Sequence, residues 1–240
     1  MNVTTVFFDL DGTLLPMDQN RFVKAYFSGI AKRLAPLGYE PQALIEAIWS
    51  GTAAMIKNDG SRTNETAFWD RFTEIYGERA REDLPTFDAF YRENFDEIAA
   101  VCGFSPRSKE IVDHLHRMGI RTVLATNPIF PAVATQKRMR WAGLSPEDFL
   151  YYTTYENSRH CKPNPAYYED ILNALGLRAE ECLMVGNDVE EDMITETLGM
   201  KVFLLTDCLI NNRGIDVSRY PHGGFAELSE FLNRTLSPNI

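Results

Sequence analysis

Basic residues are scarce in this chain relative to acidic ones, which limits the partners that it can bind. The 240 residues include 24 Lys and Arg against 34 Asp and Glu, so the net charge is −10. Proteins that bind nucleic acids or anionic membranes take much of their affinity from basic side chains. We therefore expect neither as a partner. An anionic substrate stays compatible with this charge, because a bound metal ion reverses the sign of a local site.

Cysteine pairs and long apolar runs are also missing. The cysteines at 102, 161, 182 and 208 form no CxxC pair, which speaks against a zinc site or a thioredoxin-type motif. No apolar run approaches the roughly 18 residues that mark a membrane-spanning helix. The first residues, MNVTTVFFDLDG, lack the basic segment and apolar stretch of a signal peptide. Because scattered cysteines suit a reducing compartment, we expect a cytoplasmic protein.

What is present first is a long stretch with helical periodicity. Four apolar residues recur at intervals of four, as on one face of a helix: Phe22, Tyr26, Ile30 and Leu34. Two further aromatic stripes lie within 68–76 and 87–98. A shorter helix is predicted over 41–49, with Gly51 among the breaks between helices. No strand pattern interrupts this stretch, so we expect an all-helical domain over 18–103.

The rest of the chain alternates between helical stripes and short apolar runs. The stripes end at glycines that are each followed by an apolar residue: Gly119, Gly143, Gly176 and Gly199. Strands are predicted over 3–8, 120–125, 149–152, 182–185 and 201–205. Continuous apolar runs are typical of strands that are buried on both faces. Residues 1–17 and 104–240 therefore predict an α/β domain with a parallel, Rossmann-like sheet of about five strands and helices on both faces.

Polar side chains follow three of these predicted strands. They are Asp9 and Asp11, then Thr126 and Asn127, then Asn187, Asp188 and Asp192. Lys162 lies between two predicted elements, just before a helix that begins near Pro165. Ligands of parallel α/β sheets bind beyond the carboxyl ends of the strands. We therefore expect these side chains to meet at one edge of the sheet.

This set of side chains suits a magnesium ion and a phosphate group. Carboxylates at one edge repel one another unless a cation joins them. Mg²⁺ prefers hard oxygen ligands and keeps phosphate oxygens of the substrate in its shell. Hydroxyl, amide and ammonium groups supply donors for the remaining phosphate oxygens. One carboxylate can attack phosphorus, and a second carboxyl group can protonate the leaving group and later activate water.

At these residues the chain resembles a known family. The segment 9–14, DLDGTL, resembles the DxDGTL signature of the haloacid dehalogenase superfamily of phosphatases. Thr126, Lys162 and the Gly-Asn-Asp of 186–188 with Asp192 resemble the second, third and fourth motifs of that family, in the same order. The helical domain between the first two motifs resembles the C1-type cap of the family. Four motifs in order are a far more specific signal than DxDGT alone.

The resemblance implies a role for each residue of the first three motifs. Asp9 corresponds to the nucleophile and a Mg²⁺ ligand. Asp11 corresponds to the general acid and base, with its backbone carbonyl on the metal. Thr126 and the backbone of Asn127 correspond to the groups that hold the transferring phosphoryl group. Lys162 corresponds to the cation that neutralises the nucleophile and the phosphate.

The fourth motif carries one departure from the family. Many relatives have Asp directly after the glycine, where this chain has Asn187. The resemblance therefore implies Asp188 as the direct metal ligand, Asn187 as a helper, and Asp192 as a further ligand or a partner of the ligands. Glu190 and Glu191 are interpreted as acidic residues at a helix start, where they favour the helix dipole.

The resemblance implies Mg²⁺-dependent hydrolysis of a small phosphorylated metabolite through an aspartyl-phosphate, with a mobile cap that excludes water. The carboxyl group of Asp11 argues against a hydrolytic dehalogenase, which lacks it and acts without metal. A phosphomutase and a phosphonatase stay open as alternatives. A phosphonatase would use a cap lysine that forms a Schiff base, and the cap offers Lys24, Lys32 and Lys57. A third alternative is a protein that binds a phosphorylated ligand without turnover.

Overall fold

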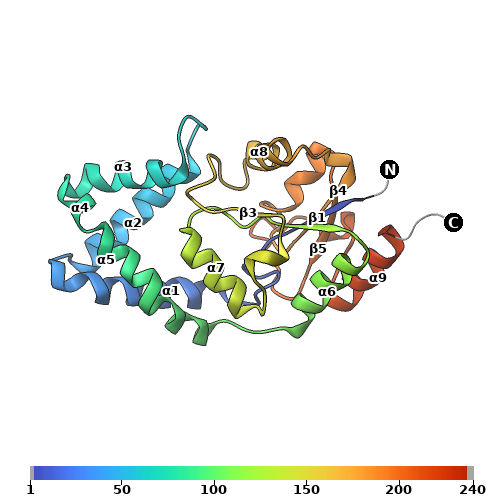
Figure 1. Ribbon diagram of the computed structural model, residues 1–240, viewed down its shortest axis with the longest axis horizontal. Helices are drawn as coiled ribbons and strands as arrows, with labels where there is room; N and C mark the ends of the chain where they lie inside the picture. Colours follow the sequence, from blue (N-terminus) through green and yellow to red (C-terminus); the bar gives the residue numbers. More distant parts are fainter. Residues whose placement is uncertain (1–2, 237–240) are drawn as a thin grey trace.

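The computed structural model describes residues 3–236 of the chain. One parallel sheet forms the centre of one of its two halves (Figure 1). In spatial order its strands are β3 (Tyr151–Tyr152), β2 (Arg121–Leu124), β1 (Thr5–Phe8), β4 (Cys182–Gly186), β5 (Lys201–Leu205) and β6 (His222–Gly223). Every neighbouring pair is parallel. The parallel sheet is confirmed, with six strands in place of about five. The sixth was missed because two residues, His-Gly, carry no strand pattern.

Helices cover both faces of this sheet, as predicted. Val6 and Phe8 of β1 join an apolar cluster with α6 (Pro106–Arg117), α7 (Ala132–Trp141) and α9 (Phe225–Leu236). Phe7 belongs to a second cluster on the other face, with α8 (Pro165–Leu175) and the 3₁₀ segment Met193–Leu198. Figure 1 shows α8 on one side of the sheet and α6 and α9 on the other. All four residues of β1 are buried, which explains its unbroken apolar sequence.

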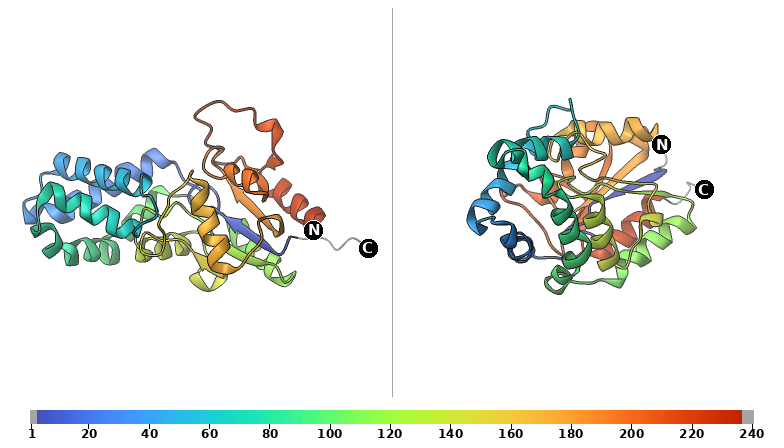
Figure 2. Two further views of the ribbon diagram at one scale, coloured as in Figure 1. Left: turned by 90° about the horizontal axis from the view of Figure 1, so that it is seen from above. Right: turned by 60° about the vertical axis from the view of Figure 1, so that its left-hand side comes forward.

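The predicted helical stretch forms a separate layer beyond the carboxyl ends of the strands (Figure 2). Its helices are α1 (Gln19–Leu34), α2 (Pro41–Ile56), α3 (Asn64–Tyr76), α4 (Arg79–Glu82) and α5 (Leu84–Ala89). A π-helical turn over Phe90–Asn94 and a 3₁₀ segment over Phe95–Val101 follow. Residues 19–101, called the helical region below, contain no strand, as the sequence predicted.

The prediction for α2 was wrong at its end. The helix does not stop at Trp49 but continues through Gly51 to Ile56. A Cβ atom at position 51 would lie 2.6 Å from the ring of Phe68 on α3. Glycine at this position therefore allows α2 and α3 to approach closely, and it does not mark a break in the helix.

Two chain segments side by side connect the helical region to the sheet region. Met17 forms an antiparallel bridge with Cys102, and the backbone N–H of Gly103 donates to the carbonyl of Pro16 (2.7 Å). These residues lie where the sequence predicts the joins between the domains. The domain limits themselves, 1–17 with 104–240 and 18–103, stay a prediction.

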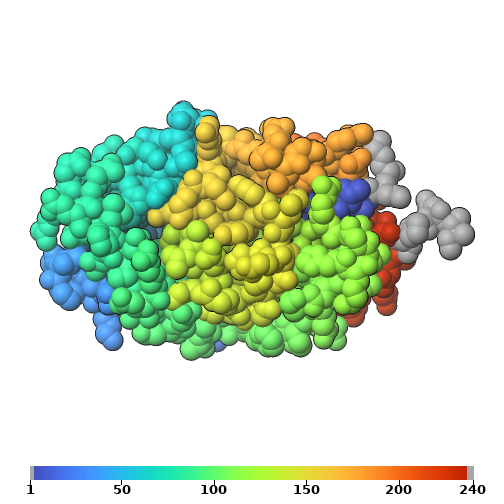
Figure 3. All heavy atoms as spheres, in the orientation of Figure 1, coloured from blue at the N-terminus to red at the C-terminus, as the bar shows by residue number. Residues whose placement is uncertain are grey.

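The helical region also contacts the sheet region away from this neck. Asn64, fully buried at the start of α3, donates through its side chain to the carbonyls of Pro128 and His160, both at 3.2 Å. Its backbone N–H donates to the carbonyl of Ser158 (2.8 Å), so the loop near residue 60 lies against the segment before Lys162 (Figure 3). Across the described chain, no helix combines the length and apolar character needed to cross a membrane.

Candidate active site

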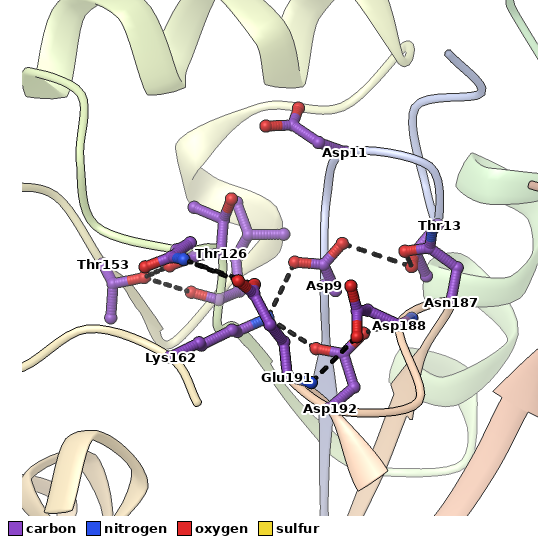
Figure 4. A network of polar contacts seen from close by, with 12 residues as sticks. Asp9, Asp11, Thr13, Thr126, Thr153, Lys162, Asn187, Asp188, Glu191 and Asp192 are labelled. Carbon is purple, nitrogen blue, oxygen red and sulfur yellow. Dashed lines mark hydrogen bonds and ion pairs between the residues drawn. The ribbon is translucent and has the colours of Figure 1, made fainter. Parts of the chain in front are cut away.

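Asp9 is the first residue beyond the carboxyl end of the central strand β1. One of its carboxylate oxygens, Oδ1, accepts a hydrogen bond from Lys162 Nζ at 2.8 Å. The other, Oδ2, accepts from Thr13 Oγ1 at 3.3 Å. Figure 4 shows the Lys162 side chain reaching Asp9 from a different segment of the chain. The structure thus brings the first and third predicted motifs into direct contact.

Lys162 is completely buried and is held by a second carboxylate. Its Nζ also donates to Asp192 Oδ1 at 2.6 Å, while Asp192 Oδ2 accepts from the backbone N–H of Asp188 at 3.0 Å. Burial acts to lower the pKa of Lys162, but the charges of Asp192 and Asp9 raise that pKa well above its usual value. Lys162 therefore carries a positive charge beneath Asp9. Asp192 orients both this ammonium group and the backbone of Asp188.

The two residues after Gly186 have different surroundings. The side-chain amide of Asn187 is engaged at both ends, accepting from Thr13 Oγ1 (2.9 Å) and donating to the carbonyl of Cys208 (2.7 Å). Asp188 Oδ1 accepts from the backbone N–H groups of Glu190 (2.8 Å) and Glu191 (2.9 Å). Asn187 thus holds two loops together. Asp188 presents a carboxylate beside Asp9 (Figure 4).

Glu191 lies in the site, which the interpretation as a plain helix-start acid did not foresee. Both of its carboxylate oxygens lie 3.2 Å from Asn127 Nδ2, which donates to them. Burial raises the pKa of Glu191 to about 7. The only sign of this role in the sequence was the position of Glu191 between Asp188 and Asp192. Its partner Asn127 is distant in the chain, so no local pattern joins the two residues.

The second motif is held through its backbone. The carbonyl of Thr126, just beyond β2, accepts from Thr153 Oγ1 (2.6 Å) and from the hydroxyl of Tyr167 (2.8 Å). Thr126 and Asn127 both line the cavity that contains Asp9. Neither Thr153 nor Tyr167 was predicted, because nothing in their own segments marks them as support for this loop.

Asp11 lies at the same edge but points away from Asp9 (Figure 4). Its Oδ2 forms an ion pair with Arg138 of α7, and the Arg138 guanidinium lies 4.6 Å from the centre of the Phe130 ring. Burial raises the pKa of Asp11, and Arg138 opposes that rise. The sequence analysis did not identify Arg138, which is completely buried although it stands in a basic stretch of its helix.

A cavity of about 800 Å³ separates these residues from the helical region. At one end it is lined by the acidic residues described above. At the other end it is lined by aromatic and aliphatic side chains of α1, α2, α3 and α5. A phosphonatase would need a Schiff-base lysine in this cavity. The three candidates are not among its lining residues in the described part of the chain: Lys24, Lys32 and Lys57.

The site has the chemistry of a divalent cation site of the hard-oxygen type. Five carboxylates lie at this edge, against the two cations Lys162 and Arg138: Asp9, Asp11, Asp188, Glu191 and Asp192. Two buried side-chain oxygens here, Asp11 Oδ1 and Asn127 Oδ1, have no hydrogen-bond partner in the described structure. Excess negative charge and unpaired oxygens are what a bound Mg²⁺ ion would satisfy.

A second acidic group lies elsewhere and has no part in this site. It consists of Asp113, His116 and Asp148. Lys109 already pairs with both of its carboxylates. The group lies near the amino ends of β2 and β3, at the opposite edge of the sheet from Asp9. It therefore provides no support for a metal ion at the candidate site.

Comparison with known proteins identifies the family of this chain. A family described as haloacid dehalogenase-like hydrolase matches residues 3–195. Pyrophosphatase PpaX of Halalkalibacterium halodurans is 26% identical over 84% of this chain and 82% of its own length. Ribulose-1,5-bisphosphate 5-phosphatase of Halopiger xanaduensis is 26% identical over 79% of both chains. A crystal structure of 2-haloacid dehalogenase from Pseudomonas syringae pv. Tomato shares the fold, with a TM-score of 0.66, 20% identity, and coverage of 97% of this chain and 99% of that one.

Proposed function

The chain belongs to the haloacid dehalogenase-like hydrolases, and on that premise we propose that it hydrolyses a small phosphomonoester through an aspartyl-phosphate on Asp9. The observation that carries this proposal is Asp9 at the carboxyl end of β1, which lines a cavity and is paired with the buried Lys162. Two relatives named as a pyrophosphatase and a ribulose bisphosphate phosphatase favour phosphoryl chemistry.

In the first step, a carboxylate oxygen of Asp9 attacks phosphorus and forms the acyl-phosphate bond while the bond to the leaving oxygen breaks. The Asp11 carboxyl group gives its proton to that leaving oxygen, after turning from Arg138 toward the substrate. Lys162, Thr126 and the backbone of Asn127 stabilise the charge on the transferring group.

In the second step, water attacks the phosphorus of the aspartyl-phosphate. The Asp11 carboxylate takes a proton from this water, so the Asp9 carboxylate is restored and inorganic phosphate leaves. Asp192 keeps Lys162 in place throughout, through the 2.6 Å contact described above. Both steps therefore use residues that lie on the loops after β1, β2 and β4 and on the segment before α8.

Mg²⁺ is the expected cofactor, and Asp9, Asp188 and the backbone carbonyl of Asp11 would hold it. When bound, it would reduce the repulsion between the anionic substrate and the carboxylates of the site. Asn187 serves as a helper by fixing the loop that carries Asp188. The excess of carboxylates over cations supports this assignment.

The helical region is proposed as a cap that excludes water during transfer to Asp9 and opens for release of the product. The neck at Met17 and Cys102 supports a division into a core of 1–17 and 104–240 and a cap of 18–103. The four cysteines are all free, which favours a cytoplasmic enzyme that acts on a soluble metabolite.

Phosphate release from a panel of phosphomonoesters, with Mg²⁺ and with EDTA, tests this function. Asp9→Asn should lower the rate at least about a thousandfold with every ester, because the nucleophile is lost. Asp216→Asn, a change at an exposed loop residue, is the matched control and should retain the wild-type rate. Phosphate release that survives in Asp9→Asn would show that Asp9 is not the nucleophile.

The same panel separates the alternatives. Interconversion of isomeric sugar phosphates without phosphate release would identify a phosphomutase. Cleavage of a carbon–phosphorus bond would identify a phosphonatase. Tight binding of a phosphorylated ligand with no turnover in Mg²⁺ would identify a binding protein. Each of these results would overturn the proposed hydrolase activity.

A further inference from the structure

We propose that the substrate is the phosphomonoester of a largely apolar alcohol, whose hydrocarbon part lies along the aromatic wall of the helical region. This inference rests on the proposed phosphatase function and specifies its substrate class. It is carried by the lining of the 800 Å³ cavity, which changes from charged to aromatic with distance from Asp9.

A row of four aromatic rings leads away from the catalytic edge. Phe130 lies against Arg138, the partner of Asp11, and its ring centre is 5.3 Å from that of Tyr26. The Tyr26 ring is 5.1 Å from Phe27, and the Phe27 ring is 5.3 Å from Trp49. All four side chains line the cavity. A hydrocarbon chain attached to a phosphate at Asp9 would therefore meet aromatic carbon along its length.

Two polar side chains on this wall already have partners, whereas the buried Nε1 of Trp69 has none in the described structure. The hydroxyl of Tyr26 pairs with that of Tyr91 at 2.8 Å, and burial raises the pKa of Tyr26 to about 12, so it stays neutral. Thr52, which also lines the cavity, donates its hydroxyl to the carbonyl of Ile48 at 2.9 Å. Around Tyr26 and Thr52 the wall thus presents carbon to a ligand, which favours apolar groups.

Positive charge is missing where a second phosphate would need it. No lysine, arginine or histidine between residues 3 and 236 lines the cavity. The two cations at the catalytic end, Lys162 and Arg138, are each paired with carboxylates. A second phosphate on the substrate would lie beside aromatic rings without a partner, at a large desolvation cost. A bisphosphate or pyrophosphate therefore does not fit this wall.

The size of the cavity also agrees with an extended apolar group. Sites for drug-sized ligands have volumes of about 300–1,000 Å³ and are lined mainly by apolar and aromatic side chains. A phosphate with a two-carbon alcohol would leave most of the 800 Å³ unused. Each additional methylene in contact with the wall should improve binding of the transition state.

A homologous series of alkyl phosphates tests the proposal with the full-length enzyme in saturating Mg²⁺. We expect kcat/KM to rise about two- to fourfold for each added methylene from ethyl to octyl phosphate. Octane-1,8-diol bisphosphate and glycerol 3-phosphate should each be at least about tenfold poorer than octyl phosphate. The alkyl esters share similar leaving groups, so the differences report binding along the wall.

Trp49→Ala locates the effect on the wall. Trp49 is 50% exposed at the far end of the row, so its truncation should leave the fold intact. The change should lower kcat/KM for octyl phosphate about tenfold and leave ethyl phosphate nearly unchanged. Ile75→Ala, at a 43% exposed position of α3 that does not line the cavity, is the matched control and should alter neither.

The outcomes separate this inference from the proposed function. Phosphate release that is independent of chain length, or faster from the bisphosphate, would overturn the apolar substrate class and leave the phosphatase function standing. An equal effect of Trp49→Ala on ethyl and octyl phosphate would also overturn it. Absence of release from every ester would overturn the phosphatase function itself.

Discussion

The two walls of the cavity differ in how their side chains are held. On the sheet side, Asp9, Lys162 and Asp192 form a continuous chain of charged contacts at 2.8 and 2.6 Å. On the helical side, aromatic rings pack on one another at centre distances near 5 Å. Among the described residues, none of these rings is joined to the carboxylates of the candidate site by a hydrogen bond. The sheet side thus depends on charge placed at strand ends, and the helical side depends on contact area.

This difference separates chemistry from selectivity. A change to the charged chain should reduce turnover of every ester, since it alters the stabilisation of the reacting group. A change to the aromatic wall should alter one ester more than another, because it removes contacts that only some substrates make. Stability should follow the same division, since unpaired buried charge costs more than lost apolar contact.

The largest effect is expected from Lys162→Met, which leaves Asp9 and Asp192 without their cation. We expect the free energy of unfolding to fall by about 3–5 kcal/mol, because two buried carboxylates lose their partner. Phosphate release should fall at least about a hundredfold with all esters alike. Urea unfolding in EDTA and initial rates in Mg²⁺ measure the two effects.

Lys137→Met is the matched control for this prediction. Lys137 is also buried and donates to the carbonyl of Arg92 at 2.7 Å, but its charged partner, Asp96 on the helical region, has a side chain that is 56% exposed. Water can solvate the carboxylate that remains, so the loss should be about 1 kcal/mol. An equal loss in both variants would show that burial of the lysine stem, and not its charge, is what stabilises the site.

The place of the candidate site was predictable because its residues follow strands. Asp9, Thr126 and Asp188 each come directly after an apolar run or within two residues of one, and strand ends meet at one edge in a parallel sheet. The partners of these residues were not predictable in the same way. Arg138 and Glu191 lie in helical or turn segments, and only the packing of distant segments decides which of their charges become buried.

The end of α2 shows a different limit of sequence patterns. Glycine commonly marks the end of a helix, and Gly119, Gly143, Gly176 and Gly199 all do so with positive φ. Gly51 has the same side chain but lies within a helix, facing Phe68. The two roles differ only in what approaches the glycine, and a local pattern does not contain that information.

Gly51→Ala should have the next largest effect, and it acts on the helical side. The added Cβ would lie 2.6 Å from the Phe68 ring, which is itself packed against Trp69 and Phe72. We expect a loss of about 1–3 kcal/mol in the free energy of unfolding, partly offset by the better helix propensity of alanine. Thermal unfolding, monitored by circular dichroism, measures it.

Gly29→Ala on α1 is the matched change, with a Cβ position 3.0 Å from the Phe90 ring. Gly29→Ala should lower the free energy of unfolding by less than Gly51→Ala, because a smaller displacement of the Phe90 ring relieves the contact. Because Phe68 lines the cavity, Gly51→Ala should also reduce activity with octyl phosphate more than with ethyl phosphate. An equal reduction for both esters would place Phe68 outside the contact with substrate.

The smallest effect, and the only expected gain, comes from Glu191→Gln on the sheet side. Burial raises the pKa of this carboxyl group to about 7 in the folded protein, above its ordinary value in the unfolded chain. As pH rises, the unfolded chain loses this proton first, so the wild-type protein loses stability between about pH 4 and pH 7.

Glutamine carries no such proton and can still accept from Asn127. In EDTA we therefore expect Glu191→Gln to be about 1–2 kcal/mol more stable than wild type at pH 8 and equal to it at pH 4. A gain of the same size at both pH values would attribute the effect to packing and not to the buried charge, and urea unfolding across this pH range decides between the two.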